Sequence, residues 1–323
     1  MDNQTVATDN KHEKYRRLLN RCKSLPPTST AVAYPCDEVS LRGAVEAAER
    51  RLLAPTLIGP REKIEAAAKQ SGIDISSYEL IDSPHSLASA EAAVRLVREG
   101  KAEMLMKGSL HTDELMVAVV ARDTGLRTVR RISHCFVMDV PTLEQAIIIT
   151  DAAVNIFPTL EDKVHIIQNA IDLAHALGKP QPKVAILSAM ETVNPKVQST
   201  IDASALCKMA ERGQITGGIL DGPLALDNAI NLNAAKIKKI ESPVAGQADI
   251  LVVPDLEAGN MLAKSLSFLA EADAAGIVLG ARVPIILTSR ADSVMTRLAS
   301  CAVAVLVAKA RRDSATATMG HAA

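Results

Sequence analysis

The feature that most constrains the fold is an alternation of short apolar runs with longer amphipathic ones, which extends almost from end to end of the chain. Such alternation is typical of βαβ units, in which parallel strands are joined by helices that cover the sheet. In the first half we expect strands at 30–34, 55–58, 78–81 and 103–106. Apolar residues at helical spacing predict helices between these strands at 41–53, 61–71 and 86–99.

A second half begins near Asp139, where the chain reads Asp-Val-Pro. The expected strands of this half lie at 146–149, 183–187, 250–253, 276–279 and 284–287. A helix expected at 160–177 has Leu160, Val164 and Ile167 on one face and ends at Gly178. The last helix is expected at 293–309. Residues 311–323 form a polar, Ala/Thr-rich segment without a packing pattern, which predicts a disordered tail.

Composition narrows the class of protein. Hydrophobic residues make up 48% and charged residues 23% of the 323 residues, as in a globular enzyme of two domains. The chain has 36 basic and 37 acidic residues, no Trp, three Tyr and three Phe, which leaves neither a positive field nor stacking surfaces for nucleic acid. The polar N-terminus and the lack of a long apolar stretch predict a cytoplasmic protein that does not span a membrane. Five scattered cysteines argue against a disulfide framework or a zinc site.

Polar residues that follow strands are the first candidates for a site, because ligands of open α/β sheets bind at the carboxyl ends of strands. The sequence Lys107-Gly108-Ser109 ends one strand, just before a helix that we expect to begin at Thr112. Glycine permits close approach of the backbone to an anion, helix N-terminal N–H groups bind the anion, and Lys107 adds a point charge. The alternative is an ordinary strand-turn-helix junction with a surface lysine.

Two later segments occupy the same kind of position. After the strand that Pro254 ends, Asn260 opens a helix and belongs either to a polar ligand loop or to an ordinary helix cap. Ser289, Arg290 and Asp292 follow the last strand, where a hydroxyl, a guanidinium and a carboxylate are suited to acyl or phosphoryl transfer. The spacing Ser289-x-x-Asp292 also matches a helix capping box, so both interpretations stay open.

Two further features carry weaker signals. Asp221 and Asp227 flank a turn beside a hydrophobic strand and suit acid–base work, metal binding or turn chemistry, of which turn chemistry is the commonest. His134 and Cys135 resemble a nucleophile pair, but neighbours on a strand point to opposite faces and cannot touch. His134 is therefore either a structural histidine or a residue that faces a cleft. The commonest hydrolase, nucleotidase and dehydrogenase motifs are absent from the sequence.

Six segments form a specific set when they are taken in order: MKGSLHTDEL, RRISHCFVMDVP, KVAILSAMETVNPK, GGILDGPLALDNAI, SPVAGQADILVVPDLEAGNMLAK and VPIILTSRADS. Together they resemble the phosphate acetyltransferase and phosphate butyryltransferase family over residues 101–308, without a large gap. Segments 188–196 and 288–293 are more similar to the butyryl branch than to the acetyl branch. They are also similar to the transferase portion of fused enoyl-CoA hydratase/phosphate acetyltransferases.

The resemblance implies a two-domain α/β/α fold like that of isocitrate and isopropylmalate dehydrogenases, with the active site in the interdomain cleft. Proteins of this kind are usually homodimers. In such folds the C-terminal segment returns to the first domain. We therefore expect domain I to comprise 1–138 and 287–323, and domain II to comprise 139–286.

The resemblance also implies a reaction and its residues. Acyl-CoA and phosphate would be interconverted with acyl phosphate and CoA, without a metal or a tightly held cofactor. The Ser-Arg pair that supports catalysis in the acetyltransferases matches Ser289 and Arg290. The aspartate that takes the thiol proton there is replaced here by Thr296, so we expect Asp292 to act as the base. Substrate binding is expected from Lys107, Gly108, Ser109, Asn260, Arg131 and His134.

Two alternatives belong to other classes of function. A metal- and NAD-dependent decarboxylating dehydrogenase on the same fold would use Asp221 and Asp227 as metal ligands. Dependence of turnover on magnesium and NAD would reveal this enzyme. A non-catalytic protein that binds CoA or acyl phosphate would explain the missing downstream aspartate, and it would show binding without turnover.

Overall fold

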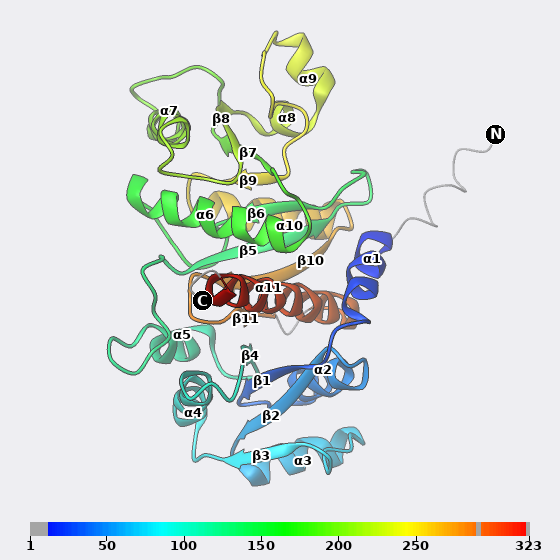
Figure 1. Cartoon of the computed structure of the whole chain (residues 1–323). Coiled ribbons are helices and arrows are strands. Elements are labelled where there is room, and N and C mark those ends of the chain that lie inside the picture. The colour runs from blue at the N-terminus through cyan, green and yellow to red at the C-terminus, as the bar shows by residue number, and fades with distance from the viewer. Residues whose placement is uncertain (1–11, 289–291, 321–323) are drawn as a thin grey trace, which may run out of the picture. The chain divides into compact units, whose positions relative to one another are not determined.

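The computed structural model describes residues 12–288 and 292–320, with the backbone alone for 317–320. The chain forms two compact units (Figure 1). Unit 1 contains the chain up to Lys14 together with Arg131–Ala274, and unit 2 contains Tyr15–Arg130 together with the chain from Ala275. The predicted domain limits fall elsewhere, at 138/139 and 286/287, and they stay a prediction.

Unit 2 is built on a mostly parallel sheet with the strand order β3-β2-β1-β4-β11-β10. Only the β10–β11 pair is antiparallel among the strand pairs described for this unit. Val32 of β1 lies opposite Leu57 of β2 and Met106 of β4, and these apolar residues are buried. The strands are β1 (Thr28–Ala33), β2 (Leu53–Gly59), β3 (Glu79–Asp82), β4 (Met104–Lys107), β10 (Asp273–Leu279) and β11 (Ile285–Ile286).

Helices follow the strands of unit 2, as the apolar spacing predicts. Asp37 caps α2, because its Oδ1 accepts a hydrogen bond from Ser40 N at 2.8 Å. Gly72 ends α3 in the left-handed region, with φ of 63°, which favours glycine. The helices are α1 (Glu13–Cys22), α2 (Glu38–Glu49), α3 (Arg61–Ser71), α4 (Ser86–Arg98), α5 (Thr112–Val120) and α11 (Val294–Gly320).

Unit 1 has the strand order β5-β6-β9-β7-β8, in which β5 and β6 are antiparallel and the other pairs are parallel. Its core contains Met138, Ile149, Leu187 and Leu251, all buried. The strands are β5 (Ser133–Asp139), β6 (Ile147–Thr150), β7 (Lys183–Leu187), β8 (Ile219–Leu224) and β9 (Ile250–Val252). The helices are α6 (Leu160–Ala176), α7 (Gln198–Glu211), α8 (Leu226–Ile230), α9 (Leu232–Ile237) and α10 (Leu256–Leu269).

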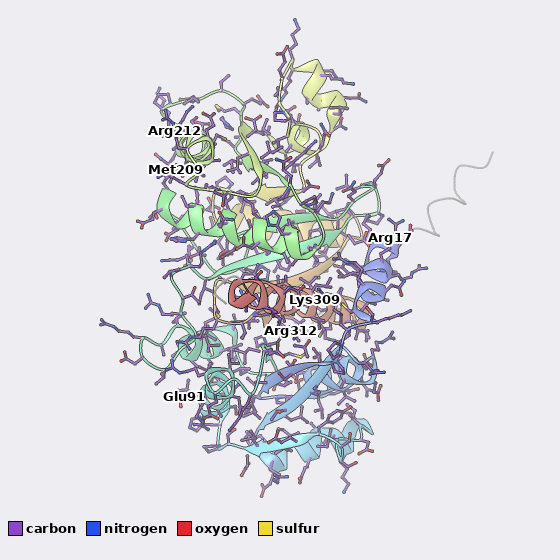
Figure 2. All side chains as sticks on the ribbon, viewed as in Figure 1. Arg17, Glu91, Met209, Arg212, Lys309 and Arg312 are labelled. Atoms are coloured by element: carbon purple, nitrogen blue, oxygen red, sulfur yellow. The ribbon has the colours of Figure 1, made fainter. Side chains whose placement is uncertain are left out.

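The predicted α/β class is confirmed, but the predicted C-terminal tail is wrong. Helix α11 continues through residue 311 to Gly320, because alanine favours helix where packing does not decide and because basic side chains anchor this stretch. Arg311 Nη1 donates to Arg282 O at 2.8 Å, and Arg312 Nη1 pairs with Glu103 at 2.6 Å. Lys309 pairs with Asp313 one turn later, and Figure 2 labels Lys309 and Arg312 on this helix. None of the helices in the described residues combines the length and apolar character that crossing a membrane requires.

Candidate active site

Unit 2 brings three strand ends together at one edge of its sheet. β4 pairs in parallel with β1 on one side and with β11 on the other. Ala33 and Lys107 are register partners at the ends of β1 and β4, and Ile286 ends β11. The chain therefore leaves the sheet in three adjacent places. The predicted site residues that follow these ends are Lys107, Gly108, Ser109, Ser289, Arg290 and Asp292.

The Lys107–Ser109 loop is held by backbone contacts to the segment that follows β1. Gly108 N donates to Ala33 O at 2.8 Å, and Ser109 N donates to Tyr34 O at 2.8 Å. A Cβ on Gly108 would lie 2.4 Å from both of these carbonyl oxygens, so the site has no room for a side chain. The sequence suggests that this glycine lets the backbone approach an anion, whereas the close approach that we observe is to the backbone after β1.

The polar side chains of this loop also fix its shape. Ser109 Oγ donates to Tyr34 O at 2.9 Å and accepts from Cys36 N at 3.2 Å. Lys107 Nζ donates to Gly108 O at 3.0 Å, within its own loop. Burial raises the pKa of the Cys36 thiol to about 11, so this neighbouring sulfur is protonated at neutral pH. The binding roles of Lys107, Gly108 and Ser109 stay a prediction.

The segment after β11 carries the predicted catalytic residues. Ser289 and Arg290 lie outside the described residues. Asp292 is described and is half-buried. Ser293 caps α11, because its Oγ accepts a hydrogen bond from Thr296 N at 3.1 Å. Asp292 is therefore not the cap of α11. The predicted capping box also involves Ser289, which lies outside the described residues.

Thr296 occupies the position at which the resemblance leads one to expect an aspartate. It is buried in the first turn of α11, where its Oγ1 accepts from Ser293 Oγ at 3.1 Å. Its carbonyl accepts from Ser300 Oγ at 3.0 Å. A hydroxyl used in this way packs the helix and is no substitute for a carboxylate base. Asp292 stays the nearest described carboxylate along the chain.

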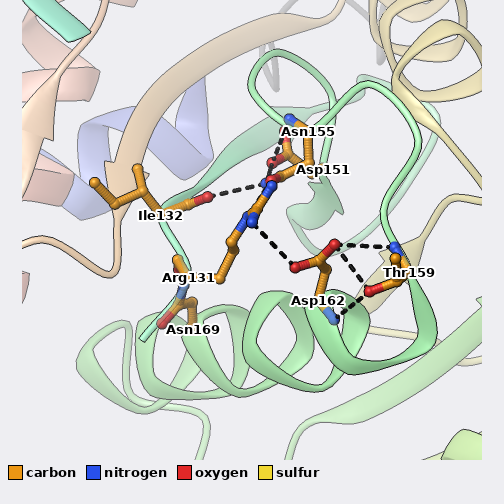
Figure 3. A network of polar contacts seen from close by, with 7 residues as sticks. All are labelled: Arg131, Ile132, Asp151, Asn155, Thr159, Asp162 and Asn169. Carbon is orange, nitrogen blue, oxygen red and sulfur yellow. Dashed lines mark hydrogen bonds and ion pairs between the residues drawn. The ribbon is translucent and has the colours of Figure 1, made fainter. Parts of the chain in front are cut away.

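Unit 1 contains a network of charged and amide side chains that we call the Arg131 network: Arg131, Asp151, Asn155 and Asp162 (Figure 3). Arg131 Nε donates to Asn155 Oδ1 at 2.8 Å, and its Nη1 lies 3.3 Å from Asp162 Oδ1. Two partners thus orient the guanidinium, while the side chain of Arg131 is 53% exposed. This combination leaves donors of a fixed fork available to a ligand.

A turn directly after β6 positions Asn155 in this network. Asp151 Oδ1 accepts from the N–H groups of Ala153 and Val154 at 2.9 and 3.0 Å. Asp151 Oδ2 accepts from Asn155 Nδ2 at 2.5 Å, and the same amide donates to Ile132 O at 2.9 Å. Neither Asp151 nor Asn155 was predicted as a site residue. A carboxylate immediately after an apolar strand is the signal that could have identified this turn.

Asp162 joins the network to the start of α6. Thr159 caps this helix by accepting from Asp162 N at 3.2 Å, and Asp162 Oδ2 accepts from Thr159 N at 3.0 Å. Burial acts to raise the pKa of Asp162, but the hydrogen bonds from Thr159 and the charge of Arg131 outweigh burial. The pKa of Asp162 therefore lies below its ordinary value, and the carboxylate partner of Arg131 is charged at neutral pH.

His134 is buried in β5 with 1% of its surface exposed. Its ring meets Phe136 edge-on at 4.4 Å, and its Nδ1 has no hydrogen-bond partner among the residues described. Burial lowers the pKa of His134 to about 4 against the opposing charge of Asp151, so the ring is neutral at pH 7. Burial also raises the pKa of Cys135 to about 12, which removes the thiolate that a dyad would need. The substrate contact predicted for His134 stays a prediction.

Asn260 lies inside α10 rather than at its start. Asp255 is the N-cap of this helix, so the capping interpretation of Asn260 is wrong. Asn260 Nδ2 donates to Ala152 O at 3.2 Å, and a Cβ on Gly259 would lie 2.8 Å from Asp151 O. Helix α10 therefore packs closely against the Asp151 turn, and Asn260 braces the turn that holds the Arg131 network.

Asp221 and Asp227 are used in local contacts. Asp221 Oδ1 accepts from Gly222 N at 2.8 Å. Asp227 Oδ2 lies 3.6 Å from Lys238 Nζ, which also pairs with Glu191 at 2.7 Å. Among the residues that the structure describes, no group of three His, Cys, Asp or Glu side chains is arranged to hold a metal ion. This arrangement favours the turn interpretation of both aspartates over the metal-ligand interpretation.

Known proteins resemble this chain over nearly its whole length. The family described as "Phosphate acetyl/butaryl transferase" matches residues 86–305. A phosphate acetyltransferase from Rhizobium meliloti is 64% identical over 95% of this chain and 97% of its own. A phosphate butyryltransferase from Clostridium beijerinckii is 42% identical over 92% of this chain and 98% of its own. The structure of a branched-chain phosphotransacylase from Enterococcus faecalis V583 superposes with a TM-score of 0.77 and 29% identity, covering 87% of this chain and 99% of that one. The chain therefore belongs to the phosphate acetyl/butyryltransferase family.

Proposed function

We propose that this protein is a phosphate acyltransferase that interconverts short-chain acyl-CoA and phosphate with acyl phosphate and CoA. The observation that carries the proposal is the 64% identity to a phosphate acetyltransferase over 95% of the chain. A butyryltransferase also matches over 92% of the chain, so the proposed substrates are short linear acyl groups from acetyl to butyryl. Neither alternative class is favoured by a particular observation.

The proposed fold and setting follow from the resemblance. The fold is a two-domain α/β/α arrangement like that of isocitrate and isopropylmalate dehydrogenases, with the active site in the interdomain cleft of a homodimer. Two compact units that each contain a largely parallel sheet support this proposal. The protein is proposed to be cytoplasmic and without a membrane partner. The near balance of 36 basic and 37 acidic residues supports the proposal that it has no nucleic-acid partner. No metal or tightly held cofactor is part of the proposed reaction.

In the proposed reaction the thiol of CoA attacks the carbonyl carbon of an acyl phosphate. A C–S bond forms, the C–O bond to phosphate breaks, and phosphate leaves with the electron pair of that bond. A free thiol has a pKa near about 8.5, so a positioned base is needed at neutral pH. We assign Asp292 as the base, Arg290 as the clamp on developing charge and Ser289 as a hydrogen-bond donor. The assignment of Asp292 is supported by its place after β11 and by the cap that Ser293 provides instead.

Substrate binding is assigned to residues of both units. At the edge of unit 2 these residues are Lys107, Gly108 and Ser109, whose loop is fixed by the backbone after β1. In unit 1 the best supported residue is Arg131, because its guanidinium is oriented and half exposed. His134 and Asn260 complete the proposed set. Both lie close to the Asp151 turn. The charge of Asp151 acts on the pKa of His134, and Asn260 donates a hydrogen bond to Ala152 O.

Turnover tests this function directly. The protein is mixed with phosphate and with acetyl-, propionyl- or butyryl-CoA, and release of the CoA thiol is followed. We expect turnover with at least one of these thioesters and little with long-chain ones. Absence of turnover with all three thioesters would refute the hypothesis that the protein is an enzyme of this kind. Binding of CoA measured on the same sample then identifies a non-catalytic binding protein.

A further inference from the structure

Arg297 is a buried cation without a counter-ion among the residues that the structure describes. It lies near the start of α11 in unit 2, and 8% of its surface is exposed. The Nε and Nη1 atoms of its guanidinium are enclosed and have no hydrogen-bond partner. Within the described part of the chain, no carboxylate pairs with it. Arginine stays protonated in proteins, and buried charges are normally paired, so this guanidinium lacks a partner that its environment requires.

The described neighbours of Arg297 include three neutral residues, Gly43, Met106 and Cys301. Helix α2 packs against α11, and a Cβ on Gly43 of α2 would lie 3.2 Å from Arg297 Cδ and 3.5 Å from its Nε. The same Cβ would lie 3.7 Å from Met106 Cε. Burial raises the pKa of Cys301 to about 12 although the charge of Arg297 opposes this rise, so the nearby thiol is neutral. Neutral walls of low polarity strengthen the attraction between a guanidinium and an anion.

The position of Arg297 adds to its positive potential. A helical side chain extends toward the N-terminus of its own helix, where unpaired N–H groups carry partial positive charge. That end of α11 follows β11, at the sheet edge where β1 and β4 also end. Two of the three guanidinium nitrogens, Nε and Nη1, are enclosed without a hydrogen-bond partner. The missing partner is therefore an anion that arrives at this edge of unit 2.

We propose that Arg297 is a binding residue for a phosphate oxyanion. The anion site follows from the unpaired guanidinium, whereas its occupant, the free phosphate substrate, rests on the proposed function. A planar guanidinium presents N–H donors in a fixed fork that matches two oxygens of a phosphate. An unpaired buried charge lowers the folding stability of the protein. Bound phosphate would neutralise this charge, which gives a reason for an arginine at this position. Arg297 thereby adds a residue of α11 to the phosphate subsite.

A binding experiment tests the anion site without reference to turnover. Thermal unfolding is followed with increasing inorganic phosphate, at constant ionic strength set with chloride, for the wild type, Arg297→Met and Arg312→Met. Arg312 serves as the control because it is a partly exposed arginine of the same helix that pairs with Glu103. We expect phosphate to raise the unfolding midpoint of the wild type and of Arg312→Met. Arg297→Met should bind phosphate about 10- to 100-fold more weakly, as expected for loss of a charged hydrogen bond.

The stability of the phosphate-free variants separates binding from a structural role. Removal of an unpaired buried charge should leave the midpoint of Arg297→Met unchanged or higher. A lower midpoint together with an undiminished response to phosphate would overturn the proposal. Arg297→Lys keeps the charge without the fork, and we expect it to bind phosphate with intermediate strength.

Kinetics distinguish the source of the phosphate group. Arg297→Met should raise the KM for phosphate by about 10- to 100-fold and change the KM for acyl-CoA by less than about twofold. A rise in the KM for acyl-CoA alone would assign the site to a phosphate group of CoA and overturn the choice of free phosphate. If the wild type shows no turnover while its stabilisation by phosphate depends on Arg297, the proposed function fails and the anion site stands.

Discussion

The Lys107–Ser109 loop of unit 2 and the Arg131 network of unit 1 both follow strand ends, but they are fixed in different ways. Backbone contacts hold the loop, in which Gly108 has no room for a Cβ. Side-chain contacts hold the network, in which Arg131 is oriented by Asn155 and Asp162. The loop geometry therefore depends mainly on backbone contacts, whereas the network depends on a charged carboxylate and a half-exposed guanidinium.

This difference predicts different tasks for the two regions. The loop is rigid and lies at the sheet edge where β11, the strand before Asp292, also ends. Such a loop suits the positioning of reacting groups, which acts on the transition state. An oriented, half-exposed guanidinium suits capture of a charged substrate, which acts on the ground state and the transition state alike. Substitutions beside the loop should therefore lower kcat, and substitutions in the Arg131 network should mainly raise KM.

Asp292→Asn gives the largest expected effect on the unit 2 side of this comparison. Asparagine keeps the size of the side chain but cannot take a proton, so kcat at neutral pH should fall by roughly 100- to 10,000-fold, the range for general base catalysis. Ser293 still caps α11, so the midpoint of thermal unfolding should change little. The loss should shrink as pH rises, because more CoA is then already thiolate.

Asp313→Asn is the matched control, since Asp313 is an exposed carboxylate of α11, the helix that follows Asp292, and pairs with Lys309. It should keep wild-type kcat across the pH range. A fully active Asp292→Asn enzyme would end the assignment of the base. The search would then move to Asp227, because His134 is buried and neutral.

Gly108→Ala tests whether the backbone contacts of the loop matter. The added Cβ would meet Ala33 O and Tyr34 O at 2.4 Å, so the loop must shift. We expect a loss of roughly 1–3 kcal/mol in unfolding free energy, as for overpacking, and a fall in kcat of similar free energy. Chemical denaturation and steady-state kinetics measure the two effects. Gly100→Ala, where a Cβ has nothing within 4 Å, should lose stability from its φ of 72° but keep kcat.

The sequence was sufficient for the fold class because the relevant signals are local. Strand β7 has its predicted bounds, since Pro182 precedes the run of five residues and the polar Ser188 follows it. The C-terminal end of α11 was missed because its contacts are not local. Arg312 pairs with Glu103, which lies 209 residues earlier in the chain. Helix propensity without apolar spacing gave no reason to extend the helix.

The candidate site could be predicted only where a single segment carries the signal. Lys107, Gly108 and Ser109 form one such segment, and their position after a strand is correct. The sequence offers a capping box that begins at Ser289, whereas Ser293, four residues later, caps α11; two serines precede the helix, and sequence spacing does not choose between them. The partners of Arg131 lie 24 and 31 residues away, on a turn and a helix whose approach depends on the folding of unit 1. Burial of Arg297 has no sequence signal, because arginine is mostly exposed.

The pH dependence of stability tests the enclosed part of unit 1. The pKa of His134 is about 4 in the folded protein and 6.5 in the unfolded chain, so the folded state binds fewer protons. The contribution to stability is complete above pH 6.5 and is lost as pH falls toward 4. Between pH 7.5 and pH 5 the loss should be about 2 kcal/mol, measured by denaturant unfolding at each pH.

His134→Gln should remove this share of the acid dependence, because glutamine does not titrate. Equal acid profiles for the wild type and His134→Gln would show that the ring is accessible to solvent.

Arg131→Gln gives the smallest expected effect and tests the other side of the comparison. The ion pair with Asp162 involves a half-exposed arginine, so its removal should cost less than about 1 kcal/mol of unfolding free energy. Loss of a charged donor to an anionic substrate should raise KM for acyl phosphate or phosphate by about tenfold, with kcat within about a factor of three. Asp162→Asn provides the control, because asparagine still accepts a hydrogen bond from Thr159 N but removes the charge that orients Arg131. This variant keeps the binding group and should raise KM less than Arg131→Gln does. If Arg131→Gln lowers kcat as strongly as Gly108→Ala and leaves KM unchanged, the network acts on the transition state and the division of tasks between the two regions is wrong.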